Sequence, residues 1–578
     1  MAELTDLTES IHNTIKDLQQ RRTSIEQDWL SQYAAYSGWP DLRSAVRLPR
    51  GQVRYFIPWV RRAIERMVTR AVKLLMPTSE WPHVKALNRK SYDASARMHQ
   101  YLYYLLRKKI KTRRVISALT RVTLLYDFPV LRTSALVHPS QEVWPSWRAV
   151  DPYAFYVFPE TASTVDDCLM MCEEVFMPYE EYLSYVEAGI CNKIKGTLST
   201  PQWPYHLVYR LAHRGVPSQG RVQGKRIFAE AQKKLDAQDQ TFIHMYDVWL
   251  KKGSEWFNIW LVVSVKDCES GECIRVQNPG RRPLYQWTTH RPLPNESYTA
   301  SLCSDIRVLG ILSNNTLSQT ESARGIATKP PVAVNMDFAH KDEQYSYGDD
   351  NIWRFHGDAR QAIQQMTVPD TSGPGLRMLQ VYVALINTLS GMGTMAEGQP
   401  GRNMPRAGSA VKTLVDLALA DIEDIAETIE VDLLTPGLSD IDFVTHSLVP
   451  SWQMLRLPGV GEGGEAEEFT KDALAGDYTY DWLGTQQFQD KQMEGENLIG
   501  MLKVIGDPNI LQMLQAQGVQ VDVTRLIELL WSSMLGEKDL SGVLKRLPNP
   551  QQVTQQNGSV MDMLNQLGSV RGKVPNGQ

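Results

Sequence analysis

The sequence lacks the patterns that usually reveal an enzyme. It has no Gly-x-x-x-x-Gly-Lys-Ser/Thr phosphate-binding loop, no His-Glu-x-x-His zinc motif and no Gly-x-Ser-x-Gly nucleophile elbow. The glycine-rich stretch 459–464 is followed by Glu465, Glu467 and Glu468, whose charges would repel a phosphate. The histidines are scattered without metal-ligand spacing. We therefore expect no catalytic residues, no bound metal and no cofactor.

Long apolar runs are also absent. The longest, at 259–265 and 381–386, are too short to span a bilayer, and the first twenty residues lack the apolar core of a signal peptide. We expect no membrane span and a chain that is soluble and cytosolic where it is made. Cys268 and Cys273 flank a turn, as in a zinc ribbon, but no second pair follows at a matching spacing. Reduced structural thiols are the favoured interpretation.

The sequence also lacks an excess of positive or negative charge. The formal net charge is -4 for 578 residues, which gives no global electrostatic reason to hold nucleic acid. The composition, 43% hydrophobic and 22% charged, is ordinary for a soluble folded protein. The chain is longer than a single hydrophobic core usually supports. From typical domain lengths we expect about two to four domains or sub-domains.

The first half of the chain alternates between helical and strand patterns. Apolar spacing predicts helices at 7–37, 58–75 and 92–125, and a short helix at 179–188. Short apolar runs predict strands within 129–176 and at 241–251, 255–265 and 272–277, so the fold class is α+β. The third helix has a basic middle, which is either solvated, paired with acidic residues of a neighbour, or in contact with nucleic acid; it comprises Arg107, Lys108, Lys109, Lys111, Arg113 and Arg114.

The centre of the chain has a different organisation. A helix at 299–325 is followed by a small β-rich module at 326–368 and a second helix at 369–390. A stretch rich in glycine and methionine, 391–410, separates that helix from a longer one that runs from Val411 to Pro436. A structureless loop of about twenty residues is uncommon in a compact domain and is usually functional or disordered. Later residues predict strands at 441–444 and 478–483, then helices within 487–535.

The long helix after this loop is strongly acidic. It carries no basic residue after Lys412, and its carboxylates are Asp416, Asp421, Glu423, Asp424, Glu427, Glu430 and Asp432. A helix face of this kind repels the phosphates of DNA. The alternative is an ordinary solvated acidic face.

This order of elements resembles the portal proteins, the head–tail connectors of tailed bacteriophages, and most of all those of short-tailed phages. The resemblance covers about residues 7–547. The family has no short diagnostic motif, so the resemblance rests on the order of elements and is carried best by 301–324, Lys329-Pro330-Pro331, 391–410 and 410–436. It implies an N-terminal wing at 1–298, stem helices at 299–325 and 369–390, a clip at 326–368, a tunnel loop at 391–410, a long helix and wing return at 411–485, a helical crown at 486–547 and a mobile tail at 548–578.

The resemblance also implies a function and its partners. Portal proteins form a homo-oligomeric ring, usually of about twelve subunits, at one vertex of the virion capsid, after assembly in the host cytoplasm. Double-stranded DNA is driven through the ring by a separate terminase motor, is retained there, and leaves through it at ejection. Capsid and scaffolding proteins and tail adaptor or tail proteins are the further partners. The ring itself is not an enzyme.

Three groups of residues carry the expected roles. The tunnel loop contributes DNA-channel residues Met392, Met395, Arg402, Asn403, Met404 and Arg406. The acidic helix lines the channel with Asp421, Asp424 and Glu427. The clip binds the motor or adaptor through Asp337, Phe338, His340, Lys341 and Asp342. Two other interpretations stay open at this point: another virion assembly protein such as a head–tail adaptor, and a nucleic-acid enzyme that uses the basic helices.

Overall fold

The computed structural model describes most of the chain up to residue 485. The described residues are 2–38, 55–77, 81–137, 141–199, 203–212, 232–234, 242–266, 270–294, 296–328, 332–335, 337, 356, 358, 360, 363–365, 372–390, 420–457 and 467–485. The chain divides into two units, one formed by 1–75 with 82–482 and the other by 76–81 with 483–578. The named helices and strands all belong to the first unit, which we describe by itself.

Two antiparallel sheets form the centre of this unit. The larger has the strand order β4-β5-β6-β7-β8, and the smaller has the order β3-β2-β9. A β-bulge lies between Trp260 and Leu261 where β7 pairs with β8. The strands are β2 (Val130–Val137), β3 (Val143–Val150), β4 (Phe155–Phe158), β5 (Met170–Pro178), β6 (Phe242–Lys252), β7 (Glu255–Val262), β8 (Glu272–Gln277) and β9 (Tyr285–Trp287). The mixed helix-and-strand content agrees with the α+β fold class predicted from the sequence.

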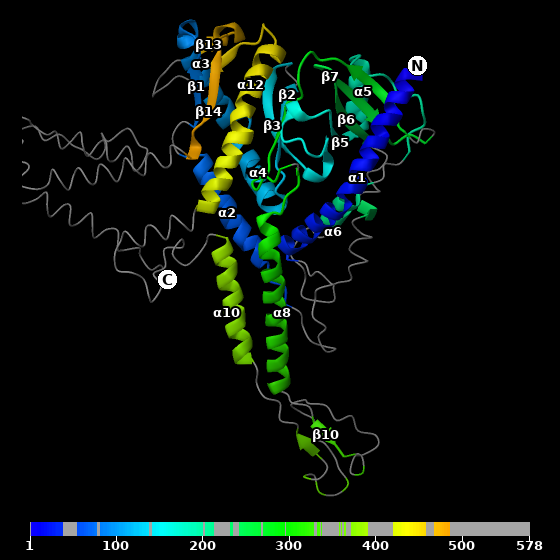
Figure 1. The fold of residues 1–578 in the computed structure, drawn as a ribbon, viewed down its shortest axis with the longest axis vertical. Helices are drawn as coiled ribbons and strands as arrows, with labels where there is room; N and C mark the ends of the chain where they lie inside the picture. Colours follow the sequence, from blue (N-terminus) through cyan, green and yellow to red (C-terminus); the bar gives the residue numbers. More distant parts are fainter. Residues whose placement is uncertain are drawn as a thin grey trace, which may run out of the picture. The chain divides into compact units, whose positions relative to one another are not determined.

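Helix α1 (Ala2–Ser37) packs on the larger sheet (Figure 1). Its buried residues Ile11, Ile15 and Leu18 recur at spacings of three and four, which is the period of one helix face. They meet alternate residues of β5 and β6, such as Cys172 and Val248, because side chains of a strand alternate between its two faces. The apolar residues whose spacing predicts this helix are therefore the ones that pack in the core.

The body also contains the helices α2 (Trp59–Leu75), α4 (Thr112–Tyr126), α5 (Tyr179–Glu187) and α6 (Tyr205–Ala212). Helix α2 buries one apolar face, with Ile64 and Leu75 wholly inaccessible, and packs against α4. The single helix expected at 92–125 is wrong. Helix α3 (Tyr92–Tyr104) passes into a π-helix, η2 (Leu105–Lys109), and the chain turns at Lys111, which has a φ of 56°, before α4 begins.

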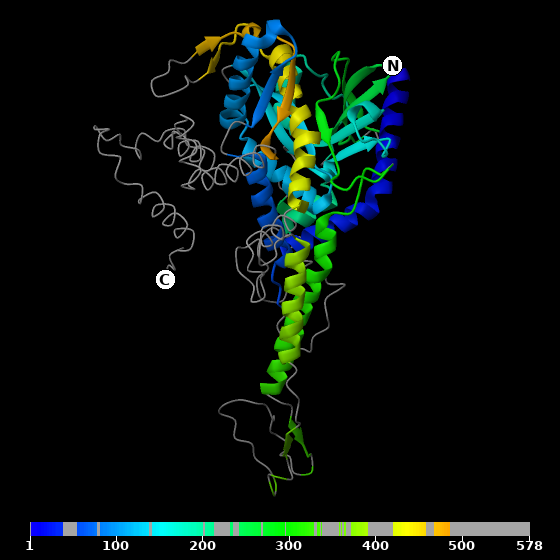
Figure 2. The same cartoon turned by 60° about the vertical axis from the view of Figure 1, so that its left-hand side comes forward.

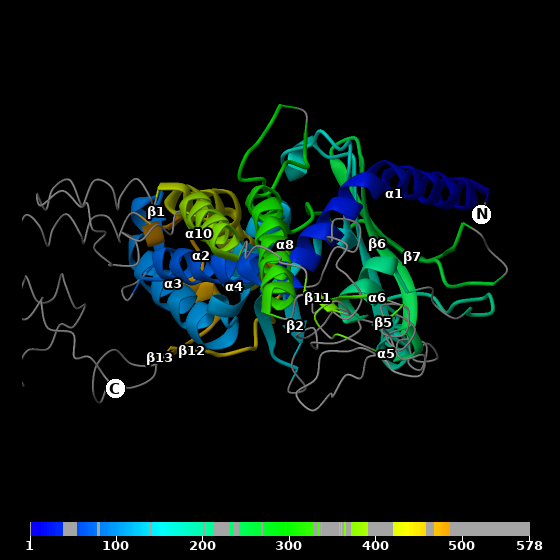
Figure 3. The ribbon, with the colours of Figure 1, turned by 90° about the horizontal axis from the view of Figure 1, so that it is seen from below.

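Helices α8 (Leu302–Thr328) and α10 (Ser372–Leu389) lie side by side (Figures 1 and 2). Their close approach depends on Gly375, because a Cβ there would lie 2.1 Å from Thr320 Oγ1. Between them in the sequence, β10 (Val332–Val334) pairs antiparallel with β11 (Ile363–Gln365). Both helices also contact α2, as the view from below shows (Figure 3). The two helices and the strand pair between them match the order predicted from the sequence.

The chain re-enters the body as one continuous helical rod. It runs from 420 to 429, through the π-helix η6 (Glu430–Leu434), and on as α12 (Thr435–Leu448). Two expectations are therefore wrong: Pro436 does not end the helix, and 441–444 is helical. Proline lacks an N–H and clashes with the carbonyl four residues earlier, but it stands at the first turn of α12, just after the wider π-helical turn.

Two short strand pairs join the end of the described chain to the body. Strand β1 (Pro82–Ala86) pairs antiparallel with β14 (Tyr478–Trp482), close to the predicted strand at 478–483. Strand β12 (Leu455–Leu457) pairs with β13 (Glu467–Phe469). Trp482 Nε1 donates to the carbonyl of Leu75 at 2.8 Å, so the C-terminal strand is fixed to the end of α2. None of the helices in the described ranges has the length and apolarity needed to cross a membrane.

Candidate functional site

The acidic segment predicted to line a channel has two distinct faces. Asp421, Asp424 and Glu427 are all exposed and recur every three residues, so they form one stripe. The opposite face is buried and apolar, and consists of Ile422, Ile425, Ala426, Ile429 and Leu433. We call the three exposed carboxylates the acidic stripe. Apolar packing holds its helix in place, so the position of the helix does not depend on these carboxylates.

Charged neighbours lie along the flanks of the same helix. The Nδ1 of His290 lies 3.6 Å from Asp424 Oδ2, and the Asp424 side chain is 69% exposed. Glu423 faces Arg70 of α2; burial lowers the pKa of Arg70, and the Glu423 carboxylate acts in the opposite direction. These contacts set the helix against α2 and the loop after β9 without covering the stripe.

The π-helix η6 joins the stripe to the rest of the body. Thr288 Oγ1, just after β9, donates to Asp432 Oδ2 at 2.5 Å. The backbone N–H of Trp482 donates to Thr435 Oγ1 at 3.3 Å. π-Helical turns within longer helices are often found at functional sites. Hydrogen bonds therefore hold the turn to the loop after β9, and the first residue of α12 to strand β14.

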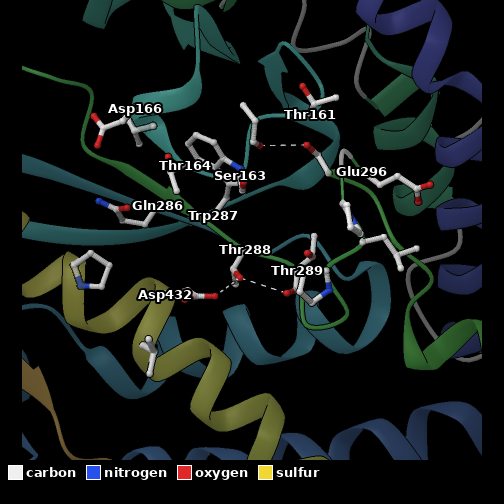
Figure 4. Close-up of a pocket in the computed structure, with 18 of the residues that line it drawn as sticks. Thr161, Ser163, Thr164, Asp166, Gln286, Trp287, Thr288, Thr289, Glu296 and Asp432 are labelled. Carbon is white, nitrogen blue, oxygen red and sulfur yellow. Dashed lines mark hydrogen bonds between the residues drawn. The ribbon is translucent and has the colours of Figure 1, made fainter.

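A cavity of about 850 Å³ opens beside this turn (Figure 4). Val431, Asp432 and Pro436 form one side, and the loop 161–166 forms the other. Hydroxyl and carboxylate groups line it, from Ser163, Thr164, Asp166, Thr288, Thr289, Glu296 and Asp432. Trp287 also lines the cavity, and its buried Nε1 has no hydrogen-bond partner among the described residues. The size is typical of ligand pockets, but the walls are more polar than usual.

Asp440 of α12 supports this region from behind and is only 2% exposed. It accepts hydrogen bonds from Gln286 Nε2 at 3.0 Å and Arg282 Nη2 at 3.5 Å, and both donors belong to residues that line the cavity. Burial raises the pKa of this carboxyl to about 6, against the opposing effects of Gln286 and Arg282. The carboxylate is therefore held in its charged form at neutral pH at some cost to stability.

This raised pKa predicts a pH-dependent stability. The folded protein holds a proton on Asp440 that the unfolded chain has lost, so the free energy of unfolding should fall as pH rises from about 4 to about 6. The contribution is about 3 kcal/mol at 1.36 kcal/mol per pKa unit. Urea unfolding at both pH values should show this difference shrinking in Asp440→Asn. The exposed control Asp421→Asn should keep the full difference between the two pH values. An equal difference in the wild type and both variants would contradict the assignment.

Only one of the three predicted residue groups lies wholly within the described residues. The acidic stripe is a continuous exposed surface. In the clip group, Asp337 is exposed in a turn where its N–H donates to Asn335 Oδ1 at 3.1 Å, and Phe338, His340, Lys341 and Asp342 lie outside the described residues. All six tunnel-loop residues, Met392, Met395, Arg402, Asn403, Met404 and Arg406, also lie outside them.

The cysteines show no metal arrangement in the part of the chain that the structure describes. Cys168, Cys172, Cys191 and Cys303 are buried and Cys273 is half-buried; all five are free thiols. Cys273 Sγ contacts the carbonyl of Arg275 at 3.4 Å, and Cys268, its candidate partner in a zinc ribbon, lies outside the described ranges. Across those ranges no group of three or more His, Cys, Asp or Glu residues is placed to hold a metal ion.

Sequence reasoning missed the cavity and both π-helices. The signal available for η6 is Pro436 inside an otherwise continuous apolar repeat, a pattern that ordinarily marks the end of a helix. The cavity brings together loops far apart in the chain, and no local pattern marks it. No protein-family model matches this chain, and no curated protein matches it either.

Proposed function

We propose that this chain is the portal protein of a tailed bacteriophage, a subunit of a ring that conducts double-stranded DNA through one capsid vertex. The proposal is supported most by the α8–α10 pair. Two long helices pack side by side, and the sequence between them contains a small strand pair, as in the stem and clip of portal proteins. The chain then returns to the α+β body through an acidic helix.

The exposed apolar residues of α10 support an assembled state. Met378, Val381, Leu385 and Leu389 are each between 42% and 50% exposed and recur at spacings of three and four, so they share one face of a helix that packs against α8 with another face. Large apolar side chains gathered on one exposed face are characteristic of protein–protein contact. In a ring, each such face meets a different face of the next subunit and the rotation closes.

The proposed conduit has no catalytic step of its own. A separate terminase supplies the work of packaging, and the clip contacts that motor and later a tail adaptor. The acidic stripe fits a wall that must not grip its cargo, because each phosphate contact that a protein makes deepens its binding to DNA.

Negative-stain imaging of the purified full-length protein tests the proposal. A hollow ring with a channel as wide as duplex DNA is the expected result. A catalytically active monomer would overturn it, and rings that form only when docked onto another ring would favour a head–tail adaptor. Trimming 398–406 should leave rings intact but change DNA packaging or retention; loss of the ring would show that this loop is structural.

Neutralising the acidic stripe gives a second prediction. The triple variant Asp421→Asn, Asp424→Asn, Glu427→Gln should change the free energy of unfolding by less than about 1 kcal/mol, since exposed positions tolerate substitution. The ring should hold duplex DNA more tightly at low salt, because the repulsion is gone. Three exposed carboxylates of α5 provide the matched control, with Glu180, Glu181 and Glu187 changed to Gln. Equal effects of the two triples on DNA binding would mean that the stripe is an ordinary solvated face.

A further inference from the structure

The turn between α3 and α4 concentrates exposed positive charge in a short stretch of the chain. Six of its eight residues from 107 to 114 are basic, and all six side chains are exposed; they are Arg107, Lys108, Lys109, Lys111, Arg113 and Arg114. We call these six residues the basic turn. Within the described ranges none of them forms an ion pair with a carboxylate, whereas other basic residues of the body, such as Arg121 and Arg132, do.

The frame beneath the basic turn is rigid. Leu105, Leu106 and Ile110 are buried, and the Ile110 N–H donates to the Leu105 carbonyl at 3.0 Å. Thr112 Oγ1, also buried, donates to the Leu106 carbonyl at 2.7 Å. Lys111 adopts a left-handed conformation, which costs a residue with a Cβ roughly 1 kcal/mol or more. The cations are therefore displayed on a fixed surface that carries local strain.

Aromatic rings accompany the cations. The Lys109 ammonium lies 4.2 Å from the centre of the Trp144 ring, and the Arg107 guanidinium lies 5.7 Å from that of Tyr103. Arg107 Nη1 also donates to the Tyr103 hydroxyl at 2.6 Å. The neighbouring carboxylate of Glu142 accepts from Trp144 Nε1 at 3.2 Å. These contacts orient two of the six charges but neutralise none.

Six like charges on a rigid turn repel one another, and in a chain of net charge -4 they stand out from their surroundings. A polyanion with closely spaced charges removes that repulsion, and duplex DNA carries one charge per roughly 1.7 Å of its axis. We propose that the basic turn is a sequence-independent binding surface for the phosphate backbone of duplex DNA. A conduit wall should not grip DNA, so this gripping surface belongs outside the conduit of the proposed function.

Fluorescence anisotropy with the full-length protein and a labelled duplex of arbitrary sequence tests the surface. The quadruple variant Lys108→Glu, Lys111→Glu, Arg113→Glu and Arg114→Glu reverses four of the six charges. Arg113 and Arg114 lie in the first turn of α4, where acidic residues stabilise a helix, and thermal unfolding checks that the whole variant folds. The matched control makes the same charge change at four exposed lysines elsewhere, Lys193, Lys195, Lys252 and Lys266.

We expect the wild-type affinity to fall steeply with salt, and an unlabelled duplex of another sequence to compete equally well. The slope of log affinity against log salt should be smaller by about 3 to 4 in the basic-turn variant, because each phosphate that a protein neutralises adds about 0.9 to that slope. Affinity for DNA at low salt should fall at least tenfold in the basic-turn variant. It should fall much less in the control, which has the same net charge but an intact basic turn.

Several results would overturn this inference while leaving the ring untouched. Equal losses of affinity in the two quadruple variants would mean a net-charge effect, and a loss confined to Arg402→Gln with Arg406→Gln would place the DNA-binding residues in the tunnel loop. Polyglutamate that displaces DNA and binds more tightly than DNA would identify an acidic protein as the partner. Negative-stain imaging of the same samples reports ring formation separately, so the failure of the proposed function remains distinguishable.

Discussion

Replacing Arg22 with alanine should destabilise this protein more than almost any other single change in α1. The side chain is wholly buried, and its guanidinium donates to three backbone carbonyls, those of Pro152, Tyr153 and Phe155, at 3.2, 2.5 and 2.5 Å. It also donates to Glu26 at 2.9 Å and lies 3.8 Å from the centre of the Tyr156 ring. One side chain thus fastens α1 to the chain between β3 and β4.

The expected loss is about 3 to 5 kcal/mol, because the partners of a buried charge are left unpaired and a cavity remains. Its neighbour Arg21 provides the control. Arg21 pairs with Asp17 at 2.7 Å, but its side chain is 60% exposed, so Arg21→Ala should cost less than about 1 kcal/mol. Equilibrium urea unfolding of the two variants measures both values. Similar losses in the two would contradict the role assigned to Arg22.

These adjacent arginines show where sequence reasoning ends. The apolar spacing of the helix places Arg22, four residues after Leu18, on the buried face and leaves Arg21 outside it. The spacing does not reveal what could pair with a buried guanidinium, because the carbonyls that accept from Arg22 belong to a loop more than one hundred residues further along. Local periodicity finds helices and strands because each element buries a face, and on that basis α1, α2, α8 and the strands β5 to β8 were predictable.

The π-helices were not predictable for a related reason. At η2 the buried Thr112 hydroxyl caps the carbonyl of Leu106, and at η6 Asp432 and Thr435 are held by β9 and β14. Each irregularity is fixed by contacts that local sequence does not reveal. The acidic stripe was recognisable in the sequence because it depends only on a spacing of three residues along one helix. The cavity beside it depends on loops that only the fold brings together.

Replacing Arg132 with methionine should produce the second large effect, at the junction of the two sheets. Arg132 of β2 donates to Glu173 of β5 and, at 2.9 Å, to Asp247 of β6, so one guanidinium links three strands. Glu173 and Asp247 are 4% and 8% exposed. The Tyr285 hydroxyl donates to Glu173 at 2.9 Å, and Asn258 Nδ2 donates to Asp247 at 2.6 Å. The carboxylates therefore keep neutral donors after the substitution but lose their shared cation.

Breaking a buried ion pair by removing one partner typically costs about 3 to 5 kcal/mol, because the remaining charge is left uncompensated. That cost falls on Asp247, since Glu173 still pairs with Arg148. Arg148→Met is the matched control. Arg148 also donates to Glu173, at 2.6 Å, but its side chain is 54% exposed and water can replace it, so the loss should be below about 1 kcal/mol. Urea unfolding of both variants tests whether the buried link or the exposed one holds the sheets together.

The Arg132→Met defect should also respond to a second substitution. Adding Asp247→Asn should recover part of the loss, because the substitution removes the unpaired buried charge while the side-chain oxygen of asparagine can still accept from Asn258. A defect that the second substitution leaves unchanged would mean that Arg132 acts through packing alone.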